Sequence, residues 1–151
     1  YLIFTGIVTA IPFALIWGKL VDTYGAKRII TIVLFIWLLN LGLSIGSGVF
    51  NLDNNIWWAI SGLTGILISG VWSCDRPFMH QLISDEFIGE YFGLHGFTGR
   101  LGSIIGTASW GFIATTLNLG QPTALLSLGI CILLSLIIII SIDIREKNEK
   151  N

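Results

Sequence analysis

The sequence predicts an all-α integral membrane protein with five transmembrane helices. Of its 151 residues, 54% are hydrophobic and 11% are charged, which leaves too few charged groups to cover a soluble protein of this size. The charges also fall mainly in short stretches between long apolar runs, as expected where a chain leaves a bilayer and returns. The expected spans are about residues 1–18, 29–49, 56–78, 91–117 and 124–142, followed by a charged tail at 143–151.

Small and polar residues form stripes along three of these spans. Such residues mark contacts between helices in lipid, so each stripe predicts a close helix partner. We interpret Asn40 first as a structural contact, with substrate binding as the alternative. The stripes are Asn40, Ser44 and Gly48 in the second span, Ser61, Gly65, Ser69 and Ser73 in the third, and Gly93, Gly96, Gly99, Gly102, Gly106 and Gly111 in the fourth.

Lysine and arginine are distributed unevenly between the connecting segments. The loops at 50–55 and 118–123 have none, and positive charge marks the cytoplasmic side of a membrane protein. We therefore expect the first loop, the acidic turn at 84–90 and the C-terminus to be cytoplasmic, in the cell membrane or an internal membrane. The cations that carry this argument are Lys19, Lys27, Arg28, Arg145, Lys147 and Lys150.

Composition also argues against several other classes of protein. A net charge of −1 gives no reason to expect a nucleic-acid partner. Cys74 and Cys131 lie in different apolar segments, and no Cys/His ligand spacing occurs, so we expect no disulfide, metal or cofactor. The chain starts at Tyr1 inside an apolar run and its only methionine is Met79, which suggests a fragment of a longer protein.

The first loop carries a motif with a recognisable spacing. From Gly18 to Arg28 it reads Gly-Lys-Leu-Val-Asp-Thr-Tyr-Gly-Ala-Lys-Arg, and it resembles the loop signature of the major facilitator superfamily, which joins the second and third helices of each six-helix half. In that family the glycine lets two helices approach closely, and the aspartate takes part in a charge lock that holds one face of the transporter shut. Thr23 stands where the family usually has arginine, and the alternative is an ordinary charged turn. The matching positions are Gly18, Leu20, Asp22, Gly25, Lys27 and Arg28.

Residues 70–106 are similar to the vacuole-effluxer-like branch of that family. The resemblance lies in the runs Asp75-Arg76-Pro77-Phe78-Met79 and Glu90-Tyr91-Phe92-Gly93-Leu94-His95, followed by Gly99-Arg100. The chain departs from the branch at two positions. It has Gly106-Thr107 where the branch has Gly-Pro, and it has Ser84 where the branch often has proline. The resemblance implies that the five spans are helices eight to twelve of a twelve-helix transporter, or most of its C-terminal half.

The function implied by this resemblance is secondary active transport of a small solute by alternating access. The branch is associated with efflux of amino acids or other small solutes, and the implied partners are the solute, the lipid bilayer and the N-terminal half of the same transporter. One alternative is a membrane scaffold of the same fold that has lost transport. A membrane enzyme built on Asp75, His80, Glu90 and His95 is less favoured, because no nucleophile elbow, metal pair or phosphate loop accompanies them.

Charged residues within the third and fourth spans are the remaining site candidates. If these spans form an antiparallel hairpin turning near Glu86, Asp75 and Arg100 lie within about one helical turn of the same depth. Arg100 then pairs with Asp75, binds a substrate carboxylate, or makes a gating contact in one transport state. Arg76, His80 and His95 are also close in depth, and they form either a structural cluster or a route for proton coupling.

Overall fold

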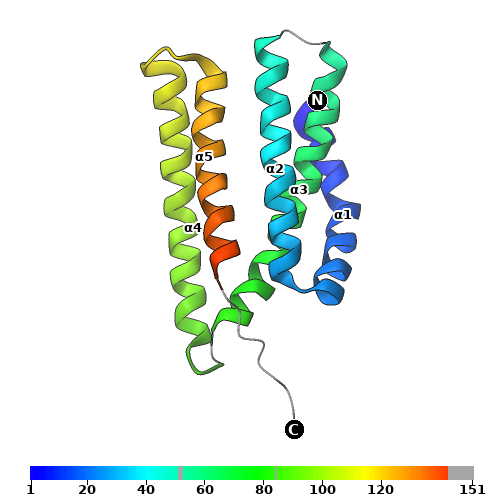
Figure 1. Ribbon diagram of the computed structural model, residues 1–151, viewed down its shortest axis with the longest axis vertical. Helices are drawn as coiled ribbons and strands as arrows, with labels where there is room; N and C mark the ends of the chain where they lie inside the picture. Colours follow the sequence, from blue (N-terminus) through cyan, green and yellow to red (C-terminus); the bar gives the residue numbers. More distant parts are fainter. Residues whose placement is uncertain (51–52, 84, 143–151) are drawn as a thin grey trace.

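The computed structural model describes residues 1–50, 53–83 and 85–142, and the fold is all-α as predicted. Successive helices run in opposite directions, and the Gly25 turn, η1 and the C-terminal end of α5 lie at the same end of the molecule (Figure 1). The predicted tail at 143–151 and Ser84 lie outside the described residues. In chain order the elements are α1 (Leu2–Tyr24), α2 (Ala26–Val49), α3 (Asn54–Leu82), the short 3-10 turn η1 (Asp85–Phe87), α4 (Ile88–Gly111), the π-helical turn η2 (Phe112–Thr116) and α5 (Gly120–Ser141).

Within the part of the chain that the structure describes, four helices are long and apolar enough to cross a membrane: α1, α2, α3 and α5. The residues of α4 are not among these candidates, although the helix has 24 residues. Glycine, His95 and Arg100 make α4 less apolar than its neighbours. Its crossing of the bilayer stays a prediction from its antiparallel place in the fold.

The segment expected to be a loop at 18–28 is almost entirely helical. α1 continues through Asp22 to Tyr24, and α2 begins at Ala26, so Gly25 alone connects the two helices. Its φ of 85° is a value that side chains with a Cβ rarely adopt. The expectation of a loop was wrong because charged residues need to leave the hydrocarbon but can remain helical outside it.

The small-residue stripe of α3 packs closely against α1, as predicted. A Cβ at Gly65 would lie 2.6 Å from both the carbonyl carbon of Gly6 and Thr9 Oγ1. Thr9 Oγ1 donates to the Gly62 carbonyl oxygen at 3.0 Å, and Trp17 Nε1 donates to the Ile66 carbonyl oxygen at 2.9 Å. The glycines of α3 have no side chain, and this allows side chains of α1 to reach the α3 backbone.

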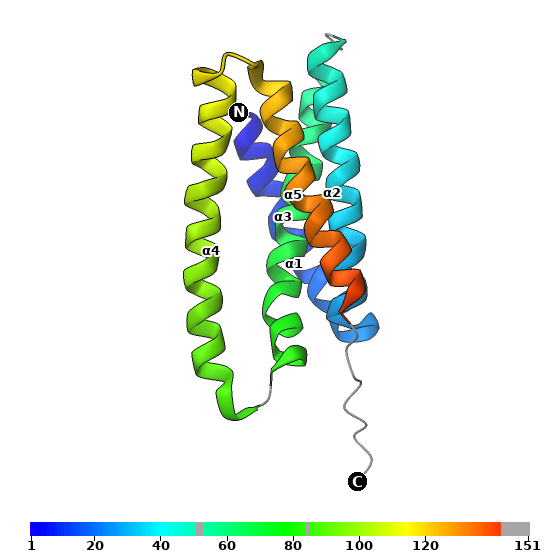
Figure 2. The same cartoon turned by 60° about the vertical axis from the view of Figure 1, so that its left-hand side comes forward.

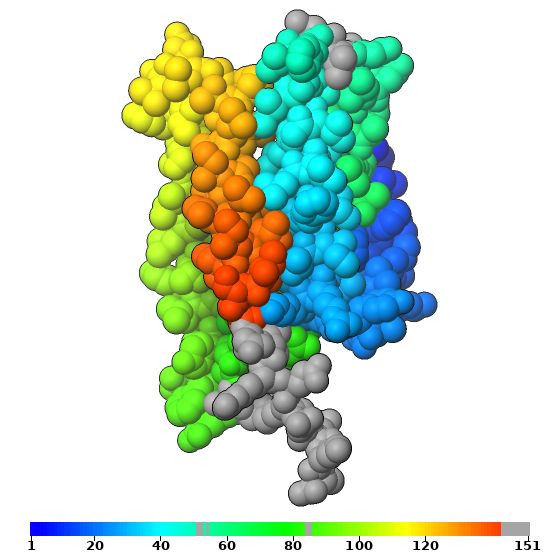
Figure 3. Space-filling model, viewed as in Figure 1, coloured from blue at the N-terminus to red at the C-terminus, as the bar shows by residue number. Residues whose placement is uncertain are grey.

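The core lies among α2, α3 and α5. Val33 on α2 and Leu67 on α3 are fully buried, and Leu136 on α5 packs against the same cluster. Figure 3 shows α5 lying against α2 on the face in view. Burial of these aliphatic groups positions α3 and α5 against α2.

α4 differs from the other helices in having few partners within the described residues. None of its residues is buried, and a Cβ at any glycine from Gly89 to Gly111 would meet nothing within 4 Å. It approaches α5 at the end that holds η2, and the lower part of α4 lies apart from α5 (Figure 2). The predicted close helix contact along its glycine stripe is therefore not present among the residues described.

Candidate functional site

Two of the six motif residues at the α1–α2 joint are exposed, and the other four are partly buried. Asp22 and Arg28 are both exposed, and Asp22 forms no ion pair within residues 1–50, 53–83 and 85–142. A Cβ at Gly18 would meet nothing within 4 Å, so this glycine is not at a close helix contact in the described part of the chain. Leu20 is partly buried and packs against the core cluster. The joint therefore presents its charges outward, and the charge lock implied for Asp22 stays a prediction.

Lys27 is the exception among the motif charges, because it contacts another helix. Its Nζ donates to the carbonyl oxygens of Ile142 and, at 3.5 Å, Ile140, at the C-terminal end of α5. The last carbonyl groups of a helix lack hydrogen-bond donors within the helix and carry partial negative charge. A lysine at this position supplies a donor and also a compensating positive charge. Sequence reasoning missed this contact, since nothing in the local pattern shows that α5 ends beside the start of α2.

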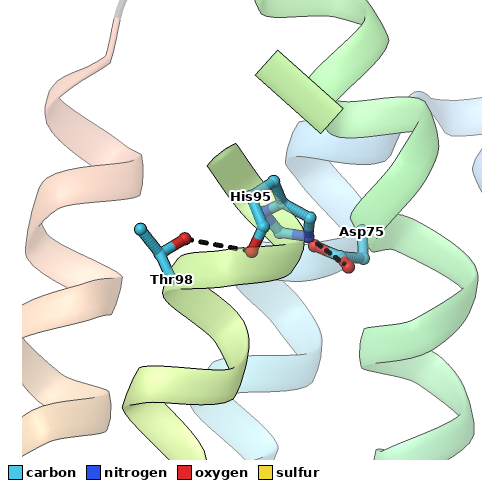
Figure 4. A network of polar contacts seen from close by, with 3 residues as sticks. All are labelled: Asp75, His95 and Thr98. Atoms are coloured by element: carbon cyan, nitrogen blue, oxygen red, sulfur yellow. Dashed lines mark hydrogen bonds and ion pairs between the residues drawn. The ribbon is translucent and has the colours of Figure 1, made fainter. Parts of the chain in front are cut away.

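The main polar contact between α3 and α4 joins Asp75 and His95. His95 Nε2 lies 2.8 Å from Asp75 Oδ2 (Figure 4), and the side chains are 34% and 40% exposed for His95 and Asp75 respectively. Thr98 Oγ1 donates to the His95 carbonyl oxygen at 3.0 Å. Asp75 lies seven residues before the last residue of α3, and His95 lies seven residues after the first residue of α4. Each is therefore about 10 Å along its helix axis from the η1 turn. The pair therefore joins the two helices near the end that holds η1.

The structure corrects the predicted partner of Asp75. Arg100 is exposed and forms no ion pair with Asp75, whose described partner is His95. The hairpin argument was sound for depth, since His95 and Asp75 do lie at a matching height. It could not specify the face of the helix, and Arg100 lies about 140° around α4 from His95 at 100° per residue. Arg76 and His80 are exposed and make no described hydrogen bond with His95, so the expected cluster of the three is absent among the described side chains.

Asn40 lies in a helix interface. It is 1% exposed, and its Nδ2 donates to Thr64 Oγ1 of α3 at 2.9 Å. Ser44 donates to the Asn40 carbonyl oxygen at 2.8 Å. Asn40 Oδ1 and Ser47 Oγ have no hydrogen-bond partner among the described atoms. These contacts favour the structural interpretation of Asn40 over substrate binding.

A groove of about 780 Å³ runs between α1 and α3. Its walls are mostly apolar and include Ile7, Ile68 and Trp72, with Ser69 and Ser73 among the few polar side chains. No ionisable residue of the described ranges lines it, and Asp75, His95 and Arg100 are not part of its wall. The groove by itself therefore offers no charged group to bind a charged solute.

Comparison with known proteins decides which family this helical bundle represents. The family model of the Major Facilitator Superfamily matches residues 1–151, the full length of the chain. The chain belongs to the major facilitator superfamily. Members of this family are transporters and not enzymes, which supports the expectation that the chain is not an enzyme.

One curated relative has a significant match. The chain is 23% identical over 141 residues to a protein of Bacillus subtilis (strain 168) described as the uncharacterized MFS-type transporter YxiO. The match covers 91% of this chain and 31% of that protein, so the chain spans about a third of the length of the relative. No solved structure matches the chain.

Proposed function

We propose that this chain is part of a secondary active transporter that moves a small solute across a membrane by alternating access. The observation that carries the proposal is the match of the superfamily model to residues 1–151. The half-exposed Asp75–His95 pair adds polar groups of the kind that are functional in membrane-embedded helices. The remaining part of the transporter, including its N-terminal half, is the proposed partner of this chain in the bilayer.

We further propose that α1–α5 correspond to helices eight to twelve of the transporter. The support is the position of the motif at Gly18–Arg28, which falls at the joint of α1 and α2. In the family that motif follows the second helix of a six-helix half, so α1 to α5 would be the second to sixth helices of a half. The similarity of residues 70–106 to the vacuole-effluxer-like branch supports amino-acid efflux as the specific activity, with a proton as the candidate coupling ion.

Flux measurements on the complete protein test this proposal. The full-length transporter is reconstituted in vesicles loaded with a mixture of radiolabelled amino acids, and release is measured with and without a pH gradient. We expect release by the full-length protein and none by the 151-residue chain, because alternating access needs two halves moving about a central site. Release by the short chain alone would contradict the proposal.

Two further outcomes distinguish the alternatives. Release of other small solutes but not of amino acids would keep the transporter and reject the amino-acid branch. A full-length protein that is folded, as shown by a monodisperse elution profile and cooperative unfolding, yet moves no solute would favour the scaffold interpretation. The motif is tested in the same flux assay by Asp22→Asn. Its matched control is Asp53→Asn, because Asp53 lies at the opposite end of the molecule beside the N-terminus of α3.

A further inference from the structure

The Asp75–His95 contact joins two helices that otherwise share little. α3 and α4 are consecutive and connected through η1, while α4 has no buried residue. Within the described residues, the bond between His95 Nε2 and Asp75 Oδ2 is the side-chain hydrogen bond between α3 and α4. A change in the charge of this pair would therefore change the strength of the contact between these helices.

The chemistry of the pair assigns the hydrogen on the imidazole. When Asp75 is ionised its carboxylate can only accept hydrogen bonds, and Nε2 is then the donor to Asp75 Oδ2 at their 2.8 Å separation. In neutral His95 the other ring nitrogen, Nδ1, is then an acceptor. Nδ1 has no hydrogen-bond partner among the described residues, and the side chain is 34% exposed. It is thus open to take up a proton from water.

We propose that His95 is a proton-binding site, and that uptake of a proton at Nδ1 tightens the contact between α3 and α4 through Asp75. A proton on Nδ1 turns a neutral imidazole bonded to a carboxylate into an imidazolium–carboxylate pair, which adds Coulomb attraction to the existing hydrogen bond. Histidine is the side chain whose charge ordinarily changes between about pH 5 and 8. To call this proton a coupling ion rests on the proposed transport function. The change in the contact between α3 and α4 does not rest on it.

The other ionisable groups near His95 are placed less favourably to control it. On α4, Glu90 and Arg100 are each five residues away, about 140° around the helix, and Tyr91 lies one turn before His95. On α3, Arg76 and His80 are exposed and make no described hydrogen bond with the imidazole. Among the described side chains, the elements packed against α4 supply Glu86 in η1, Cys131 in α5 and no ionisable group in η2. Asp75 is therefore the described charge that contacts His95.

Distance measurement by electron paramagnetic resonance tests the proposal without any solute. Spin labels are attached through an unnatural amino acid at Gln81 of α3 and Leu94 of α4, both exposed, in the full-length protein in lipid. Lowering the pH from about 8 to about 5.5 should raise the ratio of the close to the separated population by up to about fivefold, because the bond to the carboxylate gains the Coulomb attraction of a partly exposed ion pair when the imidazole becomes charged. No pH dependence in the unaltered protein would overturn the proposal.

Variants of the pair identify the titrating group. His95→Gln and Asp75→Asn should each abolish the pH dependence, whereas the control His80→Gln should retain it. Exchange of the two members, Asp75→His with His95→Asp, should restore it, since the same pair is then present in the opposite order. Persistence of the pH dependence in His95→Gln would show that another group is responsible.

A second measurement decides the question when a single variant fails to fold. In protein labelled with 15N-histidine, the His95 signal is assigned as the one lost in whichever of His95→Gln and His95→Asn folds, and its nitrogen shifts at about pH 8 report which ring nitrogen carries the hydrogen. Hydrogen on Nε2 supports the proposal, and hydrogen on Nδ1 overturns it. Because neither readout involves flux, a pH-dependent helix contact in a protein without transport would reject the proposed function and leave this inference standing.

Discussion

The crossing of α1 and α3 predicts a large effect for a very small substitution. In Gly65→Ala the added methyl group would lie 2.6 Å from the Gly6 carbonyl carbon and from Thr9 Oγ1, whereas ordinary van der Waals contact begins at 3.4 Å. The obstacle includes backbone, so the helices must separate by about 1 Å to accommodate it. Separation also stretches the bonds from Thr9 and Trp17 to the carbonyl oxygens of α3.

The expected magnitude follows from these opposing effects. Overpacking costs about 1 to 3 kcal/mol, and each interhelical hydrogen bond lost in a membrane costs about 0.6 kcal/mol. Replacing glycine by alanine within a helix returns up to about 1 kcal/mol. We therefore expect Gly65→Ala to lower the free energy of unfolding by about 1 to 3 kcal/mol.

Two matched glycines provide a graded comparison. A Cβ at Gly6 would lie 3.2 Å from the Ser61 carbonyl oxygen, and one at Gly42 would meet nothing within 4 Å. Gly6→Ala should thus be mildly destabilising, and Gly42→Ala neutral or slightly stabilising. Unfolding of the full-length protein by SDS titration in mixed micelles measures all three. Equal stability of Gly65→Ala and Gly42→Ala would refute the close helix crossing.

Three further predictions concern other contacts. Trp17→Phe should cost about 1 kcal/mol in the same unfolding assay because the Ile66 carbonyl oxygen of α3 loses the indole N–H donor. Trp72→Phe, at a 76% exposed residue, should cost less, and equal effects would contradict the assignment. Lys27→Met should cost about 0.5 to 1 kcal/mol through loss of the α5 carbonyl contacts, with exposed Lys19→Met as the control. A reporter fused after Asn151 should be active on the cytoplasmic side only, and activity on the outer side would reverse the predicted topology.

The sequence alone determined the class of the fold and the face of α3 that meets another helix. Long apolar runs separated by charges permit only membrane helices, because the backbone must satisfy its own hydrogen bonds in lipid. Spacing by four residues from Ser61 to Ser73 marked the face of α3 that meets another helix, because residues at that spacing share one face. The motif at Gly18–Arg28 indicated the family, which the match over the whole chain confirmed.

The tertiary structure decided which charged and polar groups meet. Helix depth could be estimated from residue numbers, but the rotation of α4 about its axis could not, so Asp75 was assigned to Arg100 when its partner is His95. Lys27 was assigned to a loop, but its ammonium group contacts the last carbonyl oxygens of α5. The local pattern could not show this contact, because the two segments lie 113 residues or more apart in sequence. Periodicity along a helix reports which residues share a face, while the identity of the neighbour across that face depends on how the whole bundle packs.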